Sequence, residues 1–404
     1  MLVSRRDSLA ALMAATAMLG APRIGRAADA PDIVLGAPNS LTGGFGENGQ
    51  RAVWGFLIAV DQINQEGGIK ALGGAKLKPI VADTTTDNPT QAASVTRRML
   101  DQDHAVALFG ATTSAMSLAA QVEAEKSRVP LITTSYADPL VLRGMKYTFK
   151  ITAPGSYIWN FAMDALFDMI KAERGAPPKS CAIFMGSDAV SMAVAKTLPL
   201  EAKRLGLPVV AQVNFQGNLT DPSVVVSPVL QKRPEAIFLS AFLDDTLLIM
   251  KTLRGLGIKT PVAAAGGVSS DSAGKALGAA ADGVFMPWSW SWDLAVPHES
   301  ELNALYKKAH PDAPYPCNNE ELGLGYSCGM ILRAALEKAA SRDGEKLRDV
   351  LADTTFTDLP IPATKVAFDG TGLNKYAEMI LTEWSAGNAH TVWPKKLQAM
   401  KPVF

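Results

Sequence analysis

His104–Pro139 reads HAVALFGATTSAMSLAAQVEAEKSRVPLITTSYADP, and this stretch decides the fold of the chain. Ala105–Phe109 is a short apolar run typical of a buried strand, and Leu131–Thr134 is a second one. Between them, Gly110–Ser114 predicts a turn of small residues and Ala115–Lys126 predicts a helix. The stretch is therefore a strand-helix-strand unit, whose two parallel strands end at the same edge of a sheet.

Two hydroxyl-rich turns follow these strands, and open α/β sheets bind ligands at such turns. Thr113 and Ser114 lie where the first turn opens a helix, so the nearby N–H groups carry a partial positive charge suited to a carboxylate. Ser135, Tyr136 and Ala137 form the second turn. We expect a small ligand to dock between the turns. The alternative is that Ser114 only caps the helix, as serine often does.

Strand and helix signals alternate along the rest of the chain. They begin with the strand Asp32–Pro38 and restart after Pro154. Two runs of domain length predict an α/β protein with two doubly wound parallel sheets and a boundary near residue 151. Three helices between residues 298 and 351 follow, and two strands, Thr364–Phe368 and Tyr376–Thr382, are expected to close the chain.

The first 27 residues have the pattern of an export signal. Arg5-Arg6 precedes an Ala-rich apolar run too short to span a bilayer, and the arginine pair indicates a twin-arginine signal. Without this segment the chain carries 35 basic and 38 acidic residues and has no basic stripe, which disfavours nucleic-acid binding. We expect a mature protein that is free in the periplasm and monomeric.

Three cysteines and four histidines leave little scope for metal or redox chemistry. The chain has no Cys-x-x-Cys, and no histidines stand at a metal-ligand spacing, so we expect no metal or cofactor. An oxidising compartment would permit one disulfide, for which Cys317 and Cys328 are the pair closest in sequence.

A glycine-rich loop offers the alternative function. Gly44-x-Gly46-x-x-Gly49 lies between the first strand and the first helix, as in the dinucleotide-binding fingerprint, so an exported NAD(P)-dependent oxidoreductase is conceivable. However, the acid that ends the next strand, Asp83, stands 34 residues beyond Gly49, whereas the fingerprint expects about 20. We therefore favour a binding protein over an enzyme.

Three segments together resemble one family. They are IVLGAPNSLTGGFGENGQRAVWGFLIAVDQINQEGGI (33–69), LGLGYSCGMILRAALEKAASRDGEKLRDVLADTTF (322–356) and KVAFDGTGLNKYAEMILTEW (365–384). They are similar to the type I periplasmic solute-binding proteins of ABC importers, the branched-chain amino acid and amide class. The resemblance implies two lobes joined by three hinge crossings. Lobe 1 would comprise residues 31–151 and 289–358, and lobe 2 residues 152–288 and 359–404.

The resemblance also implies roles for the two turns. Ser114 falls where the family's hydroxyl binds the ligand carboxylate. Ser135 and Ala137 fall at the second turn, where backbone groups and usually a threonine hydroxyl complete the grip, so Ala137 departs from the pattern. Amino-acid binders hold the ligand ammonium with a carboxylate after the strand that here ends at Ala265, but this chain continues Gly266-Gly267-Val268.

The missing acid bears on the ligand. Asp188 and Asp244 or Asp245 are possible substitutes, although each is equally a candidate helix cap. A buried ammonium without a charged partner costs several kcal/mol, so the gap favours ligands that lack one. Candidate apolar partners for the ligand are Phe45, Tyr136, Phe242 and Trp288.

The function that the resemblance implies is transport. The protein would capture a small hydrophobic carboxylate, either a branched-chain or other hydrophobic amino acid or an aromatic or aliphatic organic acid. It would close by hinge bending and deliver the solute to a membrane permease. A ligand-sensing subunit uses the same fold and is not distinguished by these residues.

Overall fold

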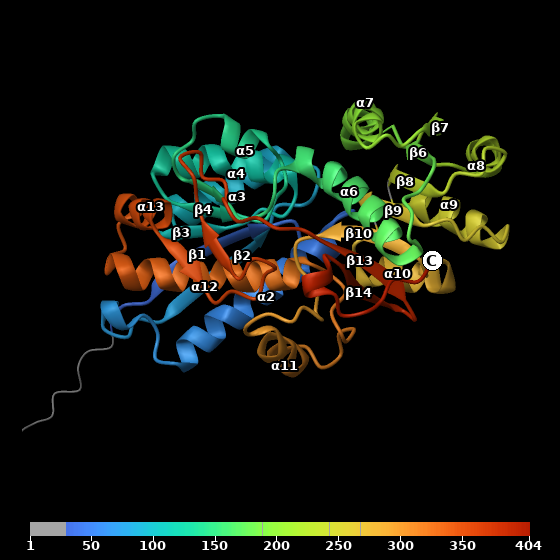
Figure 1. The fold of residues 1–404 in the computed structure, drawn as a ribbon. Helices are drawn as coiled ribbons and strands as arrows, with labels where there is room; N and C mark the ends of the chain where they lie inside the picture. Colours follow the sequence, from blue (N-terminus) through green and yellow to red (C-terminus); the bar gives the residue numbers. More distant parts are fainter. Residues whose placement is uncertain (1–29, 188, 242, 267) are drawn as a thin grey trace, which may run out of the picture.

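The computed structural model describes residues 30–187, 189–241, 243–266 and 268–404, which form two mainly parallel sheets flanked by helices (Figure 1). The five-stranded sheet has the order β2-β1-β3-β4-β5, and the seven-stranded sheet has the order β14-β13-β10-β9-β8-β6-β7. The α/β fold class is therefore confirmed. No helix in these ranges is long and apolar enough to cross a membrane.

The first sheet is all parallel, and the chain reverses its winding direction between β1 and β3. Its strands are β1 (Ile33–Asn39), β2 (Leu77–Asp83), β3 (Ala107–Phe109), β4 (Leu131–Thr133) and β5 (Thr148–Lys150). Its connections contain α2 (Gly46–Gln65), η1 (Lys70–Leu72), α3 (Pro89–Asp101), α4 (Ser114–Ser127) and α5 (Pro139–Leu142). The predicted strand-helix-strand unit is thus β3-α4-β4, with each strand shorter than the sequence predicted.

The second sheet has a parallel core whose winding reverses between β6 and β8. Its parallel strands are β6 (Cys181–Met185), β7 (Val209–Asn214), β8 (Ala236–Ala241), β9 (Val262–Gly266) and β10 (Val284–Trp288). Helix α6 (Gly155–Arg174) precedes these strands, and α7 (Ala189–Arg204), α8 (Ser223–Leu230), α9 (Leu243–Gly255), α10 (Asp271–Leu277) and η2 (Gly278–Ala281) lie between them in sequence.

The last strands of the chain differ from the prediction. Instead of one strand at Tyr376–Thr382, the structure has a hairpin of β13 (Ile380–Ser385) and β14 (Asn388–Trp393), followed by η3 (Lys395–Leu397). β13 pairs antiparallel with β10, so the second sheet is mixed rather than wholly parallel. The two turn residues, Ala386 and Gly387, have φ of 49° and 85°, as a tight hairpin turn of the right twist requires.

Three later helices, α11 (Glu299–Ala309), α12 (Glu321–Ala339) and α13 (Gly344–Asp353), precede a small ribbon of β11 (Thr355–Thr357) and β12 (Lys365–Ala367). α12 packs along α2, beside the first sheet (Figure 1). Glycines permit the close approach, because a Cβ on Gly55 would lie 1.9 Å from the Leu322 oxygen and one on Gly325 would lie 2.1 Å from the Ala52 oxygen.

The disulfide that an oxidising compartment would permit between Cys317 and Cys328 is not formed. Cys181, Cys317 and Cys328 are buried free thiols. The Cys317 sulfur lies 3.9 Å from the Asn319 carbonyl oxygen, while Cys328 lies within α12. Closeness in sequence therefore did not bring these two thiols into a disulfide.

The α2–α12 contact gives a first prediction. We expect Gly55→Ala to lower the free energy of unfolding by about 1–3 kcal/mol, because the added methyl group overlaps backbone. Chemical denaturation would measure the loss. Gly255→Ala is the matched control, since a Cβ at this helical glycine meets nothing within 4 Å and should change stability by less than about 1 kcal/mol. Equal effects of the two substitutions would contradict the close helix contact.

Candidate functional site

The winding reversal between β1 and β3 creates a polar crevice at the carboxyl ends of these strands, where open α/β sheets bind ligands. Asn39 Nδ2 donates to the Phe109 oxygen at 3.1 Å and joins the two strand ends. The Ser40 hydroxyl lies 3.1 Å from Thr113 Oγ1 and 3.3 Å from Thr84 Oγ1. Thr113 is therefore held by the loop that follows β1.

The two predicted turns meet in the structure. The Ser135 hydroxyl donates to the Ser114 hydroxyl at 3.3 Å, and the Ala137 amide lies 3.5 Å from the Ser135 oxygen. Ser114 is exposed and is the first residue of α4, whereas Thr113 occupies the capping position without a side-chain capping bond. The capping interpretation of Ser114 is thus wrong, and its hydroxyl is available at the helix terminus.

Tyr136 does not face the same way as its neighbours in the turn. Its hydroxyl donates to Glu320 Oε2 at 2.8 Å and lies 2.8 Å from the Ser289 hydroxyl. The Ser289 amide donates to the same Glu320 oxygen at 2.5 Å. One carboxylate oxygen therefore joins the second turn to the segment that leaves β10 and to the start of α12.

Glu320 and Glu321 form a buried acidic pair that the sequence argument missed, with 7% and 5% of their surface exposed. Glu321 Oε2 accepts a 2.7 Å hydrogen bond from the Thr134 hydroxyl. Burial raises the pKa of Glu320 to about 7, and burial together with the adjacent Glu320 raises the pKa of Glu321 well above its ordinary value. The signal that could have revealed them is two consecutive acids at the start of an apolar helix.

Lys150 ends β5 behind the second turn and is fully buried. Its ammonium donates to the carbonyl oxygens of Thr152 and Ala153 and lies 5.8 Å from the centroid of the Tyr136 ring. Burial lowers the pKa of Lys150 to about 8, although Asp138 partly offsets the effect. The Tyr136 hydroxyl thus contacts a buried acid, while the buried Lys150 ammonium lies near its ring.

The site residues predicted outside the two turns lie on several other elements. Phe45 precedes α2 and is 38% exposed, and Asp244 is exposed in the first turn of α9. Asp245 is buried and accepts the Asn218 and Leu219 amides at 3.2 and 2.7 Å, so it holds a loop instead of a ligand amine. Gly266 ends β9 beside Ala241. Asp188 and Phe242 lie outside the described residues.

The predicted apolar partner Trp288 is fully buried in β10, and its indole N–H donates to the Ser269 hydroxyl at 2.9 Å. Trp290 likewise donates to Glu299, and Trp292 donates to the Ala389 carbonyl. The three indoles therefore have separate partners within the protein.

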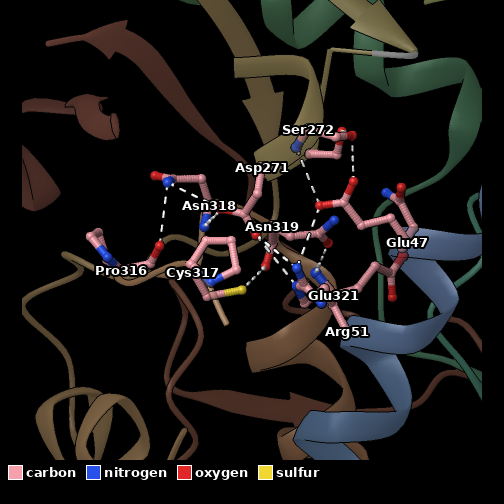
Figure 2. Close-up of polar contacts among 12 residues, drawn as sticks. Glu47, Arg51, Asp271, Ser272, Pro316, Cys317, Asn318, Asn319 and Glu321 are labelled. Atoms are coloured by element: carbon pink, nitrogen blue, oxygen red, sulfur yellow. Dashed lines mark hydrogen bonds and ion pairs between the residues drawn. The ribbon is translucent and has the colours of Figure 1, made fainter. Parts of the chain in front are cut away.

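A polar cluster joins the first helix to the second sheet. Figure 2 shows Glu47 and Arg51 of α2 facing Asp271 and Ser272 of α10. The Arg51 guanidinium lies 3.3 Å from Asp271, and both side chains are under 8% exposed. Asp271 also accepts the Asn318 amide at 2.9 Å. A cavity of about 650 Å³ opens beside this cluster.

Two of the three glycines of the dinucleotide-like loop have a packing role, whereas a Cβ on Gly44 would meet nothing within 4 Å. A Cβ on Gly49 would lie 1.8 Å from the Ser40 oxygen, and one on Gly46 would lie 2.8 Å from the Leu41 oxygen. Asp83 does not face a ribose site, because it accepts hydrogen bonds from the Leu41 amide and the Thr42 hydroxyl. Gly46 and Gly49 therefore serve the fold of the β1–α2 loop.

Two open α/β sheets and a crevice of hydroxyls at a helix terminus define a type I periplasmic binding fold. Residues 32–389 match the model of the family described as Periplasmic binding protein (Peripla_BP_6), and the chain belongs to this family. Its members are binding proteins rather than enzymes, so the oxidoreductase alternative is wrong. In the described residues, no group of His, Cys, Asp and Glu is arranged to hold a metal ion.

The chain is similar to several known proteins in sequence and in structure. It is 24% identical to "Leu/Ile/Val-binding protein homolog 8" of Brucella abortus, over 92% of this chain and 93% of the relative. The structure resembles the branched-chain amino acid binding protein LivJ of Streptococcus pneumoniae in complex with isoleucine (TM-score 0.75, 21% identity, 89% and 97% of the chains). It also resembles a solute-binding protein of R. palustris in complex with benzoate (TM-score 0.71, 16% identity, 89% and 95%). Both likenesses establish the fold.

Glu320 gives a prediction about stability and pH. Its pKa is raised in the folded protein, so its contribution is fully present below the ordinary carboxyl pKa and is lost as pH rises through about 7. We expect the ionisation of Glu320 to lower the unfolding free energy of the wild type by roughly 2 kcal/mol between about pH 5 and pH 8. Glu320→Gln should remove this part of the decrease. Urea denaturation without ligand would measure it. The surface variant Glu345→Gln should leave the slope unchanged, and an unaltered slope in Glu320→Gln would refute the assignment.

The Arg51–Asp271 pair gives a second prediction. Removing one partner of a buried pair leaves the other charge uncompensated, so we expect Arg51→Met to destabilise the protein by about 3–5 kcal/mol. Arg128→Met, which breaks an exposed pair with Glu345, should cost about 0–1 kcal/mol. Thermal or chemical unfolding of both variants would measure the two losses of stability. A loss of stability in Arg51→Met as small as in Arg128→Met would show that the Arg51–Asp271 pair does not stabilise the contact between α2 and α10.

Proposed function

We propose that this protein is the periplasmic substrate-binding component of an ABC importer. It captures a small hydrophobic solute with a carboxylate group and delivers it to the membrane permease. The observation that carries the proposal is the meeting of the Ser114 and Ser135 hydroxyls at the start of α4. Hydroxyl and backbone N–H donors at a helix N-terminus favour an anionic group, and a carboxylate fits them.

The proposed movement is closure of two lobes, comprising residues 31–151 with 289–358 and residues 152–288 with 359–404. Two observations support this division: α12 packs on α2, and the β13–β14 hairpin extends the second sheet. A ligand that contacts both lobes only when they are closed shifts the population toward the closed form. Residues 1–27 act as the export signal, and the mature protein works as a periplasmic monomer.

The proposed ligand class follows from the site and from the relatives. Isoleucine and benzoate, bound by two proteins of similar structure, both combine a carboxylate with a hydrophobic body. Burying one leucine-sized or phenyl group contributes about 1.5–3 kcal/mol. A carboxylate at a partly buried helix end adds up to about 2 kcal/mol, so micromolar affinity at about −8 kcal/mol is reachable with a few further hydrogen bonds.

Ser114 provides the direct test of the carboxylate grip. We expect Ser114→Ala to weaken ligand binding by about 1–3 kcal/mol, because a charge-assisted hydrogen bond is lost. Isothermal calorimetry would measure the affinity. Ser127→Ala, at the other end of the same helix, is the matched control and should bind like the wild type. Unchanged affinity in Ser114→Ala would remove this residue from the site.

A thermal-shift screen of the mature protein tests the function itself. Its ligands would be branched-chain and aromatic amino acids, amides, benzoate-like and aliphatic carboxylates, and NAD(P). A ligand at 100 times its dissociation constant adds about 2.7 kcal/mol of apparent stability, so a carboxylate ligand should raise the melting temperature by several degrees. Stabilisation by NAD(P) alone, or by none of the carboxylates, would overturn the transport proposal.

A further inference from the structure

Polar groups connect α2 to the start of α10 (Figure 2). Glu47 Oε2 accepts a hydrogen bond from the Ser272 hydroxyl, and Glu47 Oε1 accepts one from the Ser272 amide at 3.4 Å. One turn further along α2, the Arg51 guanidinium lies 3.3 Å from Asp271. In the proposed division of the chain, α2 belongs to lobe 1 and α10 to lobe 2. The α2–α10 contact would therefore join the two lobes.

The α2–α10 contact lies next to one of the proposed hinge crossings. Asn48 Nδ2 donates to the Ser269 carbonyl oxygen at 3.4 Å, and Asn319 Nδ2 donates to the same oxygen at 3.2 Å. The Trp288 indole N–H donates to the Ser269 hydroxyl at 2.9 Å. Trp288 ends β10, where the chain leaves lobe 2 in the proposed division. The contact is thus close to the segment about which the lobes would rotate.

The two helices α2 and α4 lie on opposite faces of the first sheet. In the strand order β2-β1-β3-β4-β5, the connection from β1 to β2 runs toward one edge, and the connection from β3 to β4 runs toward the other. Right-handed crossovers of opposite direction place their helices on opposite faces. Accordingly, α2 packs on α12, and α4 packs on α3. The α2–α10 contact and Ser114 are therefore on different sides of this sheet.

The α2–α10 contact is formed while Ser114 remains open to solvent. Ser114 is exposed, whereas the Arg51 and Asp271 side chains are only 7% and 6% exposed. A ligand enclosed between two lobes would cover Ser114, so this contact accompanies an arrangement that is not closed over the proposed carboxylate site. The cavity of about 650 Å³ beside the contact is lined by α2, α10, residues 314–318 and the β13–β14 turn. It leaves space for the lobes to move relative to each other.

We propose that the α2–α10 contact stabilises the open arrangement of the lobes, and that Glu47 and Ser272 are positioning residues that limit solute affinity without touching the solute. This inference rests on the proposed function, because it requires lobes that close on a solute. A rotation that brings lobe 2 toward Ser114 moves α10 away from α2 on the opposite face, so closure breaks these bonds. The contact thereby lowers the fraction of closed protein, and apparent affinity falls with that fraction.

The experiment removes the outer members of the contact and leaves the Arg51–Asp271 pair in place. Small-angle X-ray scattering measures the radius of gyration of Ser272→Ala and Glu47→Ala without ligand. Calorimetry measures their affinity for isoleucine, for benzoate and for any other carboxylate that stabilises the wild type. We expect a radius shifted toward that of the ligand-saturated wild type. We also expect binding that is about 3- to 10-fold tighter, because less free energy opposes closure.

Three variants serve as controls. Ser223→Ala removes a hydroxyl at the start of α8 whose partner, Asp221, belongs to the same proposed lobe. Glu345→Ala removes an acid from the first turn of α13 whose partner, Arg128, also belongs to its own proposed lobe. Neither substitution should change the radius or the affinity. Ser272→Thr keeps the hydroxyl and should behave like the wild type. A purely structural role of Ser272 predicts weaker binding in Ser272→Ala, the opposite of our expectation.

The outcomes separate the inference from the function. If Ser272→Ala and Glu47→Ala keep the wild-type radius of gyration, or bind the solute no more tightly than the wild type, the inference is overturned and carboxylate transport still stands. If the wild type binds neither probe nor any other carboxylate of the thermal-shift screen, the proposed function is overturned and the inference falls with it. A smaller radius together with tighter binding, absent from the controls, supports both.

Discussion

The structure around the candidate site depends on one buried carboxylate oxygen. Glu320 Oε2 accepts the Tyr136 hydroxyl and the Ser289 amide, and so ties the turn after β4 to the chain leaving β10 and to the start of α12. A buried acceptor must be satisfied, so these three segments are held in one arrangement. The Ser135 hydroxyl, next to Tyr136, is thereby positioned against Ser114. This connection therefore determines the shape of the crevice at the β1–β3 reversal.

Two contacts join segments that are distant in sequence, and the physical cost of forming each contact is different. The α2–α12 contact is a close approach of backbones through Gly55 and Gly325, and it leaves no space for even a methyl group. The Arg51–Asp271 contact is a buried ion pair, whose attraction must offset the desolvation of both charges. Burial raises the pKa of Asp271 although Arg51 and Asn318 oppose the shift. The first contact therefore specifies helix packing, whereas the second is sensitive to the loss of either partner.

Several acids of this protein are kept away from water without a full set of partners. Burial raises the pKa of Glu299 to about 9 and of Glu383 to about 8, and both side chains stabilise local structure through hydrogen bonds to Trp290 and to the Val403 amide. Glu320 and Glu321 differ from them because they accept hydrogen bonds from Tyr136 and Thr134, the two residues that flank Ser135. This difference in surroundings, and not the pKa shift itself, is what relates the acidic pair to the second turn of the candidate site.

The sequence alone determined the β3-α4-β4 unit and the side-by-side placement of the two turns that carry Ser114 and Ser135. Apolar runs and a short helix specify parallel strands, and the carboxyl ends of parallel strands share an edge. The tertiary structure decided what depends on contacts between distant residues. Tyr136 and Glu320 are 184 positions apart, Arg51 and Asp271 are 220 apart, and the β13–β14 hairpin is defined by its pairing with β10. No local pattern of hydrophobicity encodes such pairings, because burial and hydrogen bonding of these polar groups arise only when the folded chain removes them from water.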